Sequence, residues 1–344
     1  MTARLGIGLD IGGTKVLGAI IDETGAVVEE HRVPSPTDTW AGLLAAIVDT
    51  ISELRTRQAG VACVGIGAAG MVNLDGSIHY APNVPAFRST MVAADVEAAI
   101  GLPTVVDNDA NVAAYAEARF GAARGMKDAL VITLGTGIGG GVIVNGQVLR
   151  GAHGFAAEVG HFQIDPNGPV CACGEPGHWE AMASGTALGV MAQAAARRGE
   201  LAAVLTEAGG DPDAIRGPHV SAAAHAGDAG ALALIDQYAF NVAIGLVGLA
   251  NIFDPGVVAI AGGLVNDGEL FLGPIRKHFL GHVEGSVHRP TPEIVPATLG
   301  ERAGVIGAAI LALDRTPPAP LRSSPPTSGS PTSGAPRSPA QGPS

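Results

Sequence analysis

Two glycine-rich stretches, DIGGTK at residues 10–15 and LGTGIGG at residues 134–140, each lie between two apolar runs. The runs beside the first stretch are residues 5–9 and 15–21, and those beside the second are residues 129–134 and 141–144. Two short apolar runs joined by a glycine turn predict a β-hairpin. Because each hairpin is followed by further helices and strands, the sequence predicts two related α/β halves around a central cleft.

The rest of the chain alternates between helical and strand patterns. Apolar residues recur at helical spacing in residues 40–57, and the pairs Asp75-Gly76 and Asn145-Gly146 predict two further hairpin turns. The other predicted strands are residues 26–33, 61–67, 104–106, 147–150 and 257–261, and the other predicted helices are residues 91–100, 110–120, 184–198, 228–252 and 303–314.

Length and composition bound the number of domains. With 344 residues, of which 47% are apolar, the chain is long enough for two packed cores. We expect a small α/β domain over residues 1–120, completed by the C-terminal helix at residues 303–314, and a larger α/β domain over residues 121–302. From about residue 315 the chain is rich in Pro, Ser, Thr and Gly, so residues 315–344 are expected to form a disordered tail without a catalytic role.

Charge and cysteine content exclude several classes of protein. The formal net charge of −12 argues against nucleic acid or an anionic membrane as the main partner, because both need a basic surface. No run of 18 or more residues is free of polar or glycine breaks in a way that suggests a membrane span, and the first residues show no signal-peptide pattern. The three cysteines do not make a disulfide framework. We therefore expect a cytoplasmic protein.

The glycine patterns do not fit the common nucleotide-binding loops. Residues 65–70 and 135–140 match the letters G-x-G-x-x-G, but a dinucleotide site needs a helix directly after the last glycine, and both stretches run into predicted hairpins. Residues 8–15 have the glycine spacing of a Walker A loop, but the lysine and the hydroxyl residue are reversed and a strand follows. Neither a NAD site nor a P-loop is expected.

Two hairpin tips that face each other can hold a polyphosphate through backbone N–H groups and threonine hydroxyls. Asp10 adds a carboxylate that can hold Mg²⁺ directly or through water. The other reading is that both are ordinary tight hairpins, and for either hairpin alone that reading is equally good. The candidate phosphate-binding residues are Asp10, Gly12, Gly13, Thr14, Lys15, Thr136 and Gly137.

The hairpins are part of a larger pattern, which includes VDNDAN at residues 106–111, EVGH at 158–161, CACGEPGHWE at 171–180 and IAGG at 260–263. Together these motifs resemble the ROK family (repressors, open reading frames, kinases) of the actin-like ATPase superfamily, over residues 5 to about 314, and within it the bacterial ATP-dependent glucokinases. The resemblance implies two actin-like, ribonuclease H-like domains and ATP-dependent phosphorylation of a hexose, with glucose as the expected acceptor. It also implies that Gly262 and Gly263 lie on the adenosine side of ATP.

Phosphoryl transfer to a sugar needs a carboxylate within hydrogen-bond reach of the hydroxyl that reacts. Asp107, Asn108 and Asp109 lie where a predicted strand ends and a helix begins, the usual place for a site in an α/β fold. The resemblance implies that Asp109 is the general base and that Asn108 binds the sugar. The alternative is that Asp107 or Asp109 is only the N-cap of the helix, and we expect that alternative to hold for one of the two.

Further sugar ligands are implied by the same resemblance. Carboxylates and imidazoles suit this role because they accept or bridge hydrogen bonds from neighbouring hydroxyl groups. For Asn83, a plain turn residue is an equally good interpretation. The implied sugar-binding residues are Gly70, Asn83, Asn108, Asp109, Glu158, His161 and Glu180.

A metal site is predicted between His161 and His178. Cys171-x-Cys173 alone is a weak zinc signal, since two such cysteines are often core residues, but the two histidines lie within the spacing of structural zinc sites. The family carries three cysteines and one histidine here, and His178 takes the place of the third cysteine. We expect a Cys2His2 zinc site in which one ring nitrogen of His161 binds zinc and the other faces the sugar.

Related activities remain as alternatives. Transcriptional repressors of the family carry a DNA-binding domain before the first phosphate loop, and Asp10 comes too early for one. A polyphosphate-using kinase would favour a basic groove, and the three lysines and seventeen arginines form no clear stripe. Kinases for N-acetylmannosamine, N-acetylglucosamine, fructose or allose share the same motifs. The expected partners are a hexose and ATP, bound by a homodimer or homotetramer.

Overall fold

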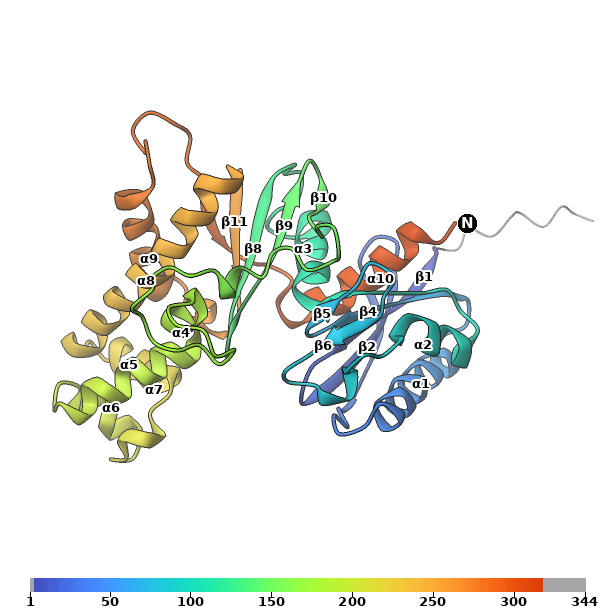
Figure 1. The fold of residues 1–344 in the computed structure, drawn as a ribbon, viewed down its shortest axis with the longest axis horizontal. Coiled ribbons are helices and arrows are strands. Elements are labelled where there is room, and N and C mark those ends of the chain that lie inside the picture. Colours follow the sequence, from blue (N-terminus) through green and yellow to red (C-terminus); the bar gives the residue numbers. More distant parts are fainter. Residues whose placement is uncertain (1–2, 318–344) are drawn as a thin grey trace, which may run out of the picture.

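The structure, a computed structural model, describes residues 3–317, and two five-stranded sheets form its framework (Figure 1). In the first sheet the strand order is β3 (Val27–Pro34), β2 (Lys15–Asp22), β1 (Leu5–Ile11), β4 (Val61–Ala68) and β7 (Thr104–Asn108). In the second sheet the order is β10 (Gln147–Val148), β9 (Ile138–Val144), β8 (Ala129–Leu134), β11 (Val257–Ala261) and β12 (Glu293–Pro296).

The two sheets share one topology. Each begins as the hairpin that the glycine stretches predict, β1 with β2 and β8 with β9, both antiparallel. The first strand of each hairpin then pairs in parallel with a later strand, β1 with β4 and β8 with β11. That strand pairs in parallel with one more, β7 or β12. The expectation of two related α/β halves is confirmed.

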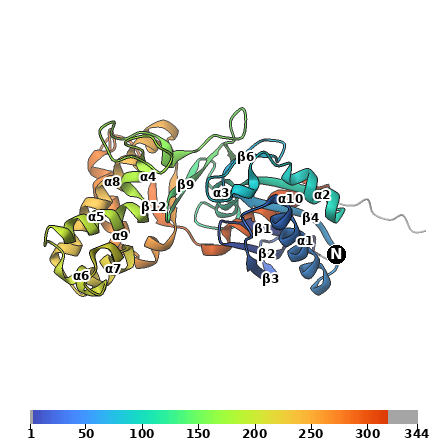
Figure 2. The same cartoon turned by 60° about the horizontal axis from the view of Figure 1, so that its bottom comes forward.

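Two helices lie between the sheets. α10 (Ala303–Arg315) packs on β1 and β4, while α3 (Asp109–Phe120) packs on α10 and on β8 and β9, and Figures 1 and 2 show the two helices side by side. A Cβ at Gly8 would lie 1.8 Å from the carbonyl oxygen of Val305, and a Cβ at Gly65 would meet the next turn of the same helix equally closely. No side chain fits at these positions, so the glycines set the distance between α10 and the sheet.

The first sheet is covered on its other face by α1 (Trp40–Arg57), with α2 (Val92–Ile100) beside it. α1 buries the apolar residues whose helical spacing the sequence shows, Leu43, Ile47, Ile51 and Leu54. α2 ends at Gly101, which has a left-handed conformation with φ of +70°, as its glycine predicts. A short two-stranded ribbon, β5 (Met71–Val72) and β6 (Ile78–Tyr80), surrounds the predicted turn at Asp75 and Gly76.

The second half is built around the long helix α8 (Ala229–Phe253). The helices near it are α4 (Trp179–Ala183), α5 (Gly185–Arg197), α6 (Ala202–Glu207), α7 (Gly217–His225) and α9 (Glu269–His282). Within residues 3–317, α8 is the one helix whose length and composition would allow a membrane span, and half of its apolar window is buried inside the protein. It packs on α4, α7 and α9, as a core helix of a soluble domain does.

The sequence missed several short or weakly patterned elements. These are α4, α6, α7, α9 and β12. β12 pairs only with β11 and ends on Pro296, and proline is tolerated at such an edge but weakens the strand signal. At the C-terminus α10 continues to Arg315, where the predicted tail begins, and residues 318–344 of that tail lie outside the described residues.

Candidate active site

The first glycine hairpin places Asp10 at the end of β1, against the start of α10. Gly12 N donates to the carbonyl oxygen of Lys15 at 3.1 Å and closes the turn. A Cβ at Gly304 would lie 3.1 Å from Oδ2 of Asp10, so the carboxylate faces the N-terminal turn of α10. A Cβ at Gly13 would lie 2.9 Å from the carbonyl oxygen of Asn83. The predicted phosphate loop and the predicted sugar residue Asn83 are therefore neighbours.

Thr14 and Lys15 complete this loop. The carbonyl oxygen of Thr14 accepts from Ser35 N at 3.1 Å, which ties the loop to the end of β3. Lys15 Nζ lies 3.0 Å from Oε2 of Glu301, which also contacts Arg32 at 3.3 Å. Both ion pairs are exposed, so each holds its geometry weakly.

The predicted catalytic segment joins β7 to α3. Asn108 is the N-cap of α3, because its Oδ1 accepts from Ala110 N at 2.9 Å and from Asn111 N at 3.2 Å. The expectation that Asp107 or Asp109 is the N-cap is therefore wrong. Asn108 Nδ2 donates to the carbonyl oxygen of Gly70 at 3.2 Å, which brings these two predicted sugar residues together.

Burial dominates the electrostatics of the carboxyl groups. It raises the pKa of Asp10 to about 6, with a further rise from Asp109 and an opposing effect of Lys15. Burial also raises the pKa of Asp109, against the backbone N–H of Ala110. The pKa of Glu158 is raised by burial and then by Asp109 and Glu180, while His161 opposes the rise. Asp109 thus acts electrostatically on both Asp10 and Glu158, and a carboxylate in such a setting is a stronger proton acceptor than a solvated one.

Glu158 and His161 flank a short 3-10 turn, η2 (Val159–His161), beside the second glycine hairpin. His161 N donates to the carbonyl oxygen of Glu158 at 3.0 Å. A Cβ at Gly160 would lie 2.3 Å from the carbonyl oxygen of Ile138, so only glycine allows the turn to lie this close to β9. The loop that bears the predicted sugar ligands therefore rests on the predicted phosphate loop.

Glu180 makes a second link to this hairpin that the sequence did not predict. Its Oε2 accepts from Ile138 N at 2.8 Å, and a Cβ at Gly137 would lie 2.3 Å from the same oxygen. Thr186 Oγ1 donates to the carbonyl oxygen of Thr136 at 2.7 Å, which fixes the hairpin to α5. Glu180 lies forty-two residues after Ile138 in the sequence, so no local pattern reveals this contact.

The predicted adenosine turn also lies at the second hairpin. Gly262 has φ of +111°, and its Cβ would lie 2.1 Å from the carbonyl oxygen of Leu134. Gly263, the next residue, opens a short 3-10 turn and has open space where a side chain would be. The two turns therefore meet at the ends of adjacent parallel strands, β8 and β11.

The predicted metal ligands come together. One ligand atom from each of His161, Cys171, Cys173 and His178 lies within 4.8 Å of every other. Cys171 Sγ is 3.8 Å from His161 Nδ1, and Cys173 Sγ is 3.2 Å from His178 Nδ1. Zinc bonds of about 2.0–2.3 Å in tetrahedral geometry separate ligand atoms by about 3.3–3.8 Å. The donor set suits zinc, the two Cys–His distances are close to this range, and Nδ1 is the nitrogen of His161 that lies toward Cys171.

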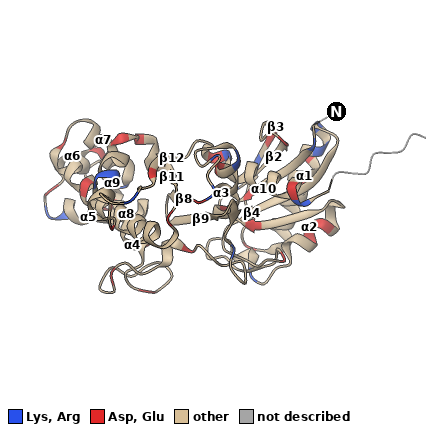
Figure 3. Cartoon of the chain, turned by 90° about the horizontal axis from the view of Figure 1, so that it is seen from above, with Lys and Arg blue, Asp and Glu red and all other residues tan. Residues whose placement is uncertain are grey.

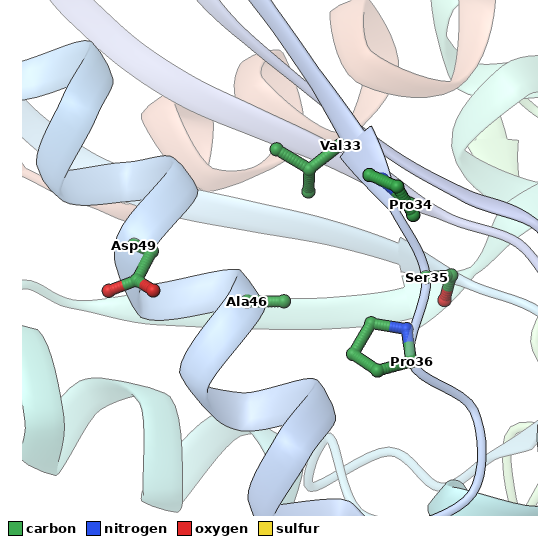
Figure 4. Close-up of a pocket in the computed structure, with 6 residues that line it drawn as sticks. All are labelled: Val33, Pro34, Ser35, Pro36, Ala46 and Asp49. Carbon is green, nitrogen blue, oxygen red and sulfur yellow. The ribbon is translucent and has the colours of Figure 1, made fainter.

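Two surface hollows lie away from these residues. One lies between the end of β3 and α1 and is lined by Val33, Pro34, Ser35, Pro36, Ala46 and Asp49 (Figure 4). The other lies between α9 and the segment that leads into β12. Neither contains a predicted site residue. Figure 3 shows Lys and Arg interspersed with Asp and Glu along the described chain.

Comparison with known proteins agrees with the motifs. The sequence matches the ROK family over residues 6–315. It is 43% identical to a glucokinase of Streptomyces coelicolor over 316 residues, which cover 91% of this chain and 99% of the relative. It is 35% identical to an N-acetylmannosamine kinase of Citrobacter koseri over 316 residues, which cover 89% of this chain and 98% of the relative.

A solved structure shares the fold. The ROK family glucokinase from Streptomyces griseus, in complex with glucose and AMPPNP, superposes with a TM-score of 0.79 at 42% identity, and the match covers 90% of this chain and 99% of that one. The family match spans nearly all of the described residues, and both glycine hairpins lie inside it. The chain belongs to the ROK family and has the fold of its hexokinase-type kinases.

Proposed function

We propose that this protein is an ATP-dependent glucokinase that converts glucose to glucose 6-phosphate, with Asp109 as the general base. The observation that carries the proposal is the position of Asp109, a half-buried carboxyl of raised pKa at the start of α3, which interacts electrostatically with Asp10 and Glu158. The names of the Streptomyces relatives support glucose as the acceptor, and the analogue in the solved structure supports ATP as the donor.

The reaction needs one proton acceptor and a firm hold on two substrates. Asp109 takes the proton of the sugar hydroxyl as its oxygen bonds to the γ-phosphorus of ATP, and ADP leaves. Asp10 would hold Mg²⁺ directly or through water, and the ion would supply positive charge to neutralise the phosphates. The sugar is bound by Gly70, Asn83, Asn108, Glu158, His161 and Glu180. The phosphates are held by Gly12, Gly13, Thr14 and Lys15 of the first hairpin and by Thr136 and Gly137 of the second. The adenosine lies against Gly262 and Gly263.

A structural zinc ion fits this scheme. His161, Cys171, Cys173 and His178 would hold it with four protein ligands and no open position, which gives it a structural role. A bound zinc ion would fix the loop between His161 and Glu180, and if Nδ1 of His161, which lies toward Cys171, is its ligand, Nε2 is left for the sugar. The loop itself has little apolar surface to hold it.

The two halves would act as domains, residues 1–120 with 303–314 and residues 121–302, each contributing one phosphate hairpin. The sugar ligands named above are divided between the two domains, since Asn83 and Asn108 belong to the first and Glu158, His161 and Glu180 to the second. We also propose a cytoplasmic homodimer or homotetramer.

The direct test is an ADP-release assay with the purified protein over a panel of hexoses, with ATP and polyphosphate as donors. The proposal expects the highest kcat/KM with glucose and ATP–Mg²⁺. An acetamido sugar would place its bulky N-acetyl group beside carboxylates such as Glu158, which bind hydrogen-bond donors such as a free hydroxyl group. A higher kcat/KM for N-acetylmannosamine would reject glucose and favour the activity of the Citrobacter relative. No ADP release with any sugar would reject the kinase itself.

A further inference from the structure

An ion pair that the proposed mechanism does not use joins the two halves of the molecule. Arg150 lies two residues after the end of β10 in the second half, and Asp107 lies in β7 of the first half. Nε and Nη2 of Arg150 both lie 2.7 Å from Oδ2 of Asp107. The Asp107 side chain is 7% exposed and that of Arg150 is 19% exposed. Each of the other ion pairs in residues 3–317 has a partner that is more than a quarter exposed, so this pair stands apart.

On one side the pair holds the catalytic segment. The second oxygen of Asp107, Oδ1, accepts from Asn108 N at 2.8 Å and from Asn111 Nδ2 at 3.0 Å. Asn111 is itself buried in the first turn of α3. One carboxylate thus fixes the backbone just before Asp109 and the helix just after it.

On the other side the pair holds the loop that leads to Glu158 and His161. The carbonyl oxygen of Arg150 accepts from Ala156 N at 3.1 Å, which folds the loop back on its first residue. A Cβ at Gly154 would lie 2.3 Å from the carbonyl oxygen of Val72, so the loop also rests on β5 of the first half. Arg150 and Gly154 are therefore two points at which this loop touches the first half.

A third charge faces the pair. Burial lowers the pKa of Arg315 at the end of α10, Arg150 lowers it further, and Asp107 opposes both. The Arg315 guanidinium therefore interacts electrostatically with both members of the pair. A buried ion pair seldom adds net stability over apolar residues, but a guanidinium that donates a charge-assisted hydrogen bond to a carboxylate oxygen and also contacts it closely through a second nitrogen fixes position well.

We propose that Arg150 is a positioning residue for phosphoryl transfer, which acts through Asp107 to hold Asn108 and Asp109 in place relative to the loop that bears Glu158 and His161. The inference rests on the proposed function. A shift of about 1 Å between a base and the hydroxyl it serves costs on the order of 100-fold in rate. The pair is suited to prevent that shift because it is short, buried and connected at both ends.

The test compares Arg150→Met and Arg150→Lys with a matched control. Arg276→Met removes an exposed arginine–carboxylate pair outside the site, in which Nη1 of Arg276 donates to both oxygens of Glu269 at 2.6 and 2.8 Å on α9. Arg150→Met should lower kcat about 10- to 100-fold and raise the sugar KM, while the KM for ATP stays near that of the wild type. Arg150→Lys keeps the charge and should recover part of kcat. Arg276→Met should leave kcat unchanged.

A double variant separates positioning from simple loss of stability. If Arg150 acts through Asp107, Arg150→Met with Asp107→Asn should lose no more kcat than the more damaging single change, whereas independent roles would multiply the losses. Multiplied losses, or a wild-type kcat in Arg150→Met, would overturn the inference.

Hydrogen exchange gives a readout that does not depend on turnover. If Arg150→Met does not fold, Arg150→Lys is the folded variant to measure, and faster exchange in both residues 104–111 and 149–161 supports the inference. Unchanged exchange in both segments overturns it. A wild-type protein that phosphorylates no hexose would instead reject the proposed function, and the exchange experiment would still report on the pair.

Discussion

Removal of the buried charge at Asp10 should change how the stability of the protein depends on pH. Its pKa is raised from 3.8 to about 6, chiefly by burial and then by Asp109. The folded protein therefore binds the Asp10 proton more tightly than the unfolded chain does. The stability that this proton contributes is present at low pH and is lost as pH rises through about 6.

The size of the effect follows from the two pKa values. A pKa of 3.8 in the unfolded chain and of about 6 in the folded protein give a loss of about 2 kcal/mol in the free energy of unfolding between about pH 4.5 and about pH 7.5. Asp10→Asn has no proton to lose at this position. The difference in unfolding free energy between Asp10→Asn and the wild type should therefore grow in favour of the variant by about 2 kcal/mol over that range.

The assay is urea unfolding followed by circular dichroism, in buffer without added divalent ions. Asp49→Asn, on the exposed side of α1, is the control and should show a flat difference with pH. Addition of ATP and Mg²⁺ should make the wild type more stable than Asp10→Asn at about pH 7.5, since the ionised carboxylate then has a cation to bind. A flat difference between Asp10→Asn and the wild type would show that burial does not set the pKa of Asp10 and would refute the reasoning.

Three further changes test the site. Asp109→Asn should lower kcat by about 10²–10⁴ with little change in sugar affinity, measured by steady-state kinetics and calorimetry; near-normal turnover would show that another group is the base. One zinc per chain is expected by elemental analysis of protein purified without chelator, with zinc kept in His178→Cys and lost in Cys171→Ser; an active, sugar-binding wild type without zinc would contradict the site. In Gly137→Ala the new Cβ would lie 2.3 Å from Oε2 of Glu180, so the KM values for ATP and sugar should both rise. Gly135→Ala, with open space around the new Cβ, should behave as the wild type. Equal kinetics of the two variants would refute the contact.

The fold was predictable because its signals are local. The residues on either side of the two glycine stretches are apolar at alternating positions or in continuous runs, and the structure pairs them as β1 with β2 and β8 with β9. α1 shows its buried face in its own sequence. α7 and β12 do not, because an alanine-rich short helix and an edge strand between prolines take their conformation from tertiary packing.

The contacts within the site were less predictable because they join distant residues. Asp107 was considered only as a helix cap, but Asn108 is the cap and Asp107 binds Arg150, forty-three residues away. Glu180 was expected at the sugar, and its bond to Ile138 N crosses forty-two residues. A pattern of residue types can show that a carboxylate is present, but its partner depends on which strands and helices lie next to it.

The gathering of carboxyl groups bears on how an acidic chain holds an anionic nucleotide. Asp109 raises the pKa of both Asp10 and Glu158, and Lys15, the basic side chain of the first hairpin, is paired with Glu301. The field at this position therefore opposes a polyphosphate. The backbone N–H groups of the two hairpin tips offset part of that field, and a divalent cation at Asp10 offsets more because it converts the nearest negative charge into a ligand. ATP binding should accordingly depend on Mg²⁺ more steeply here than in a site lined by lysines, since this chain has few basic side chains to take the place of the ion.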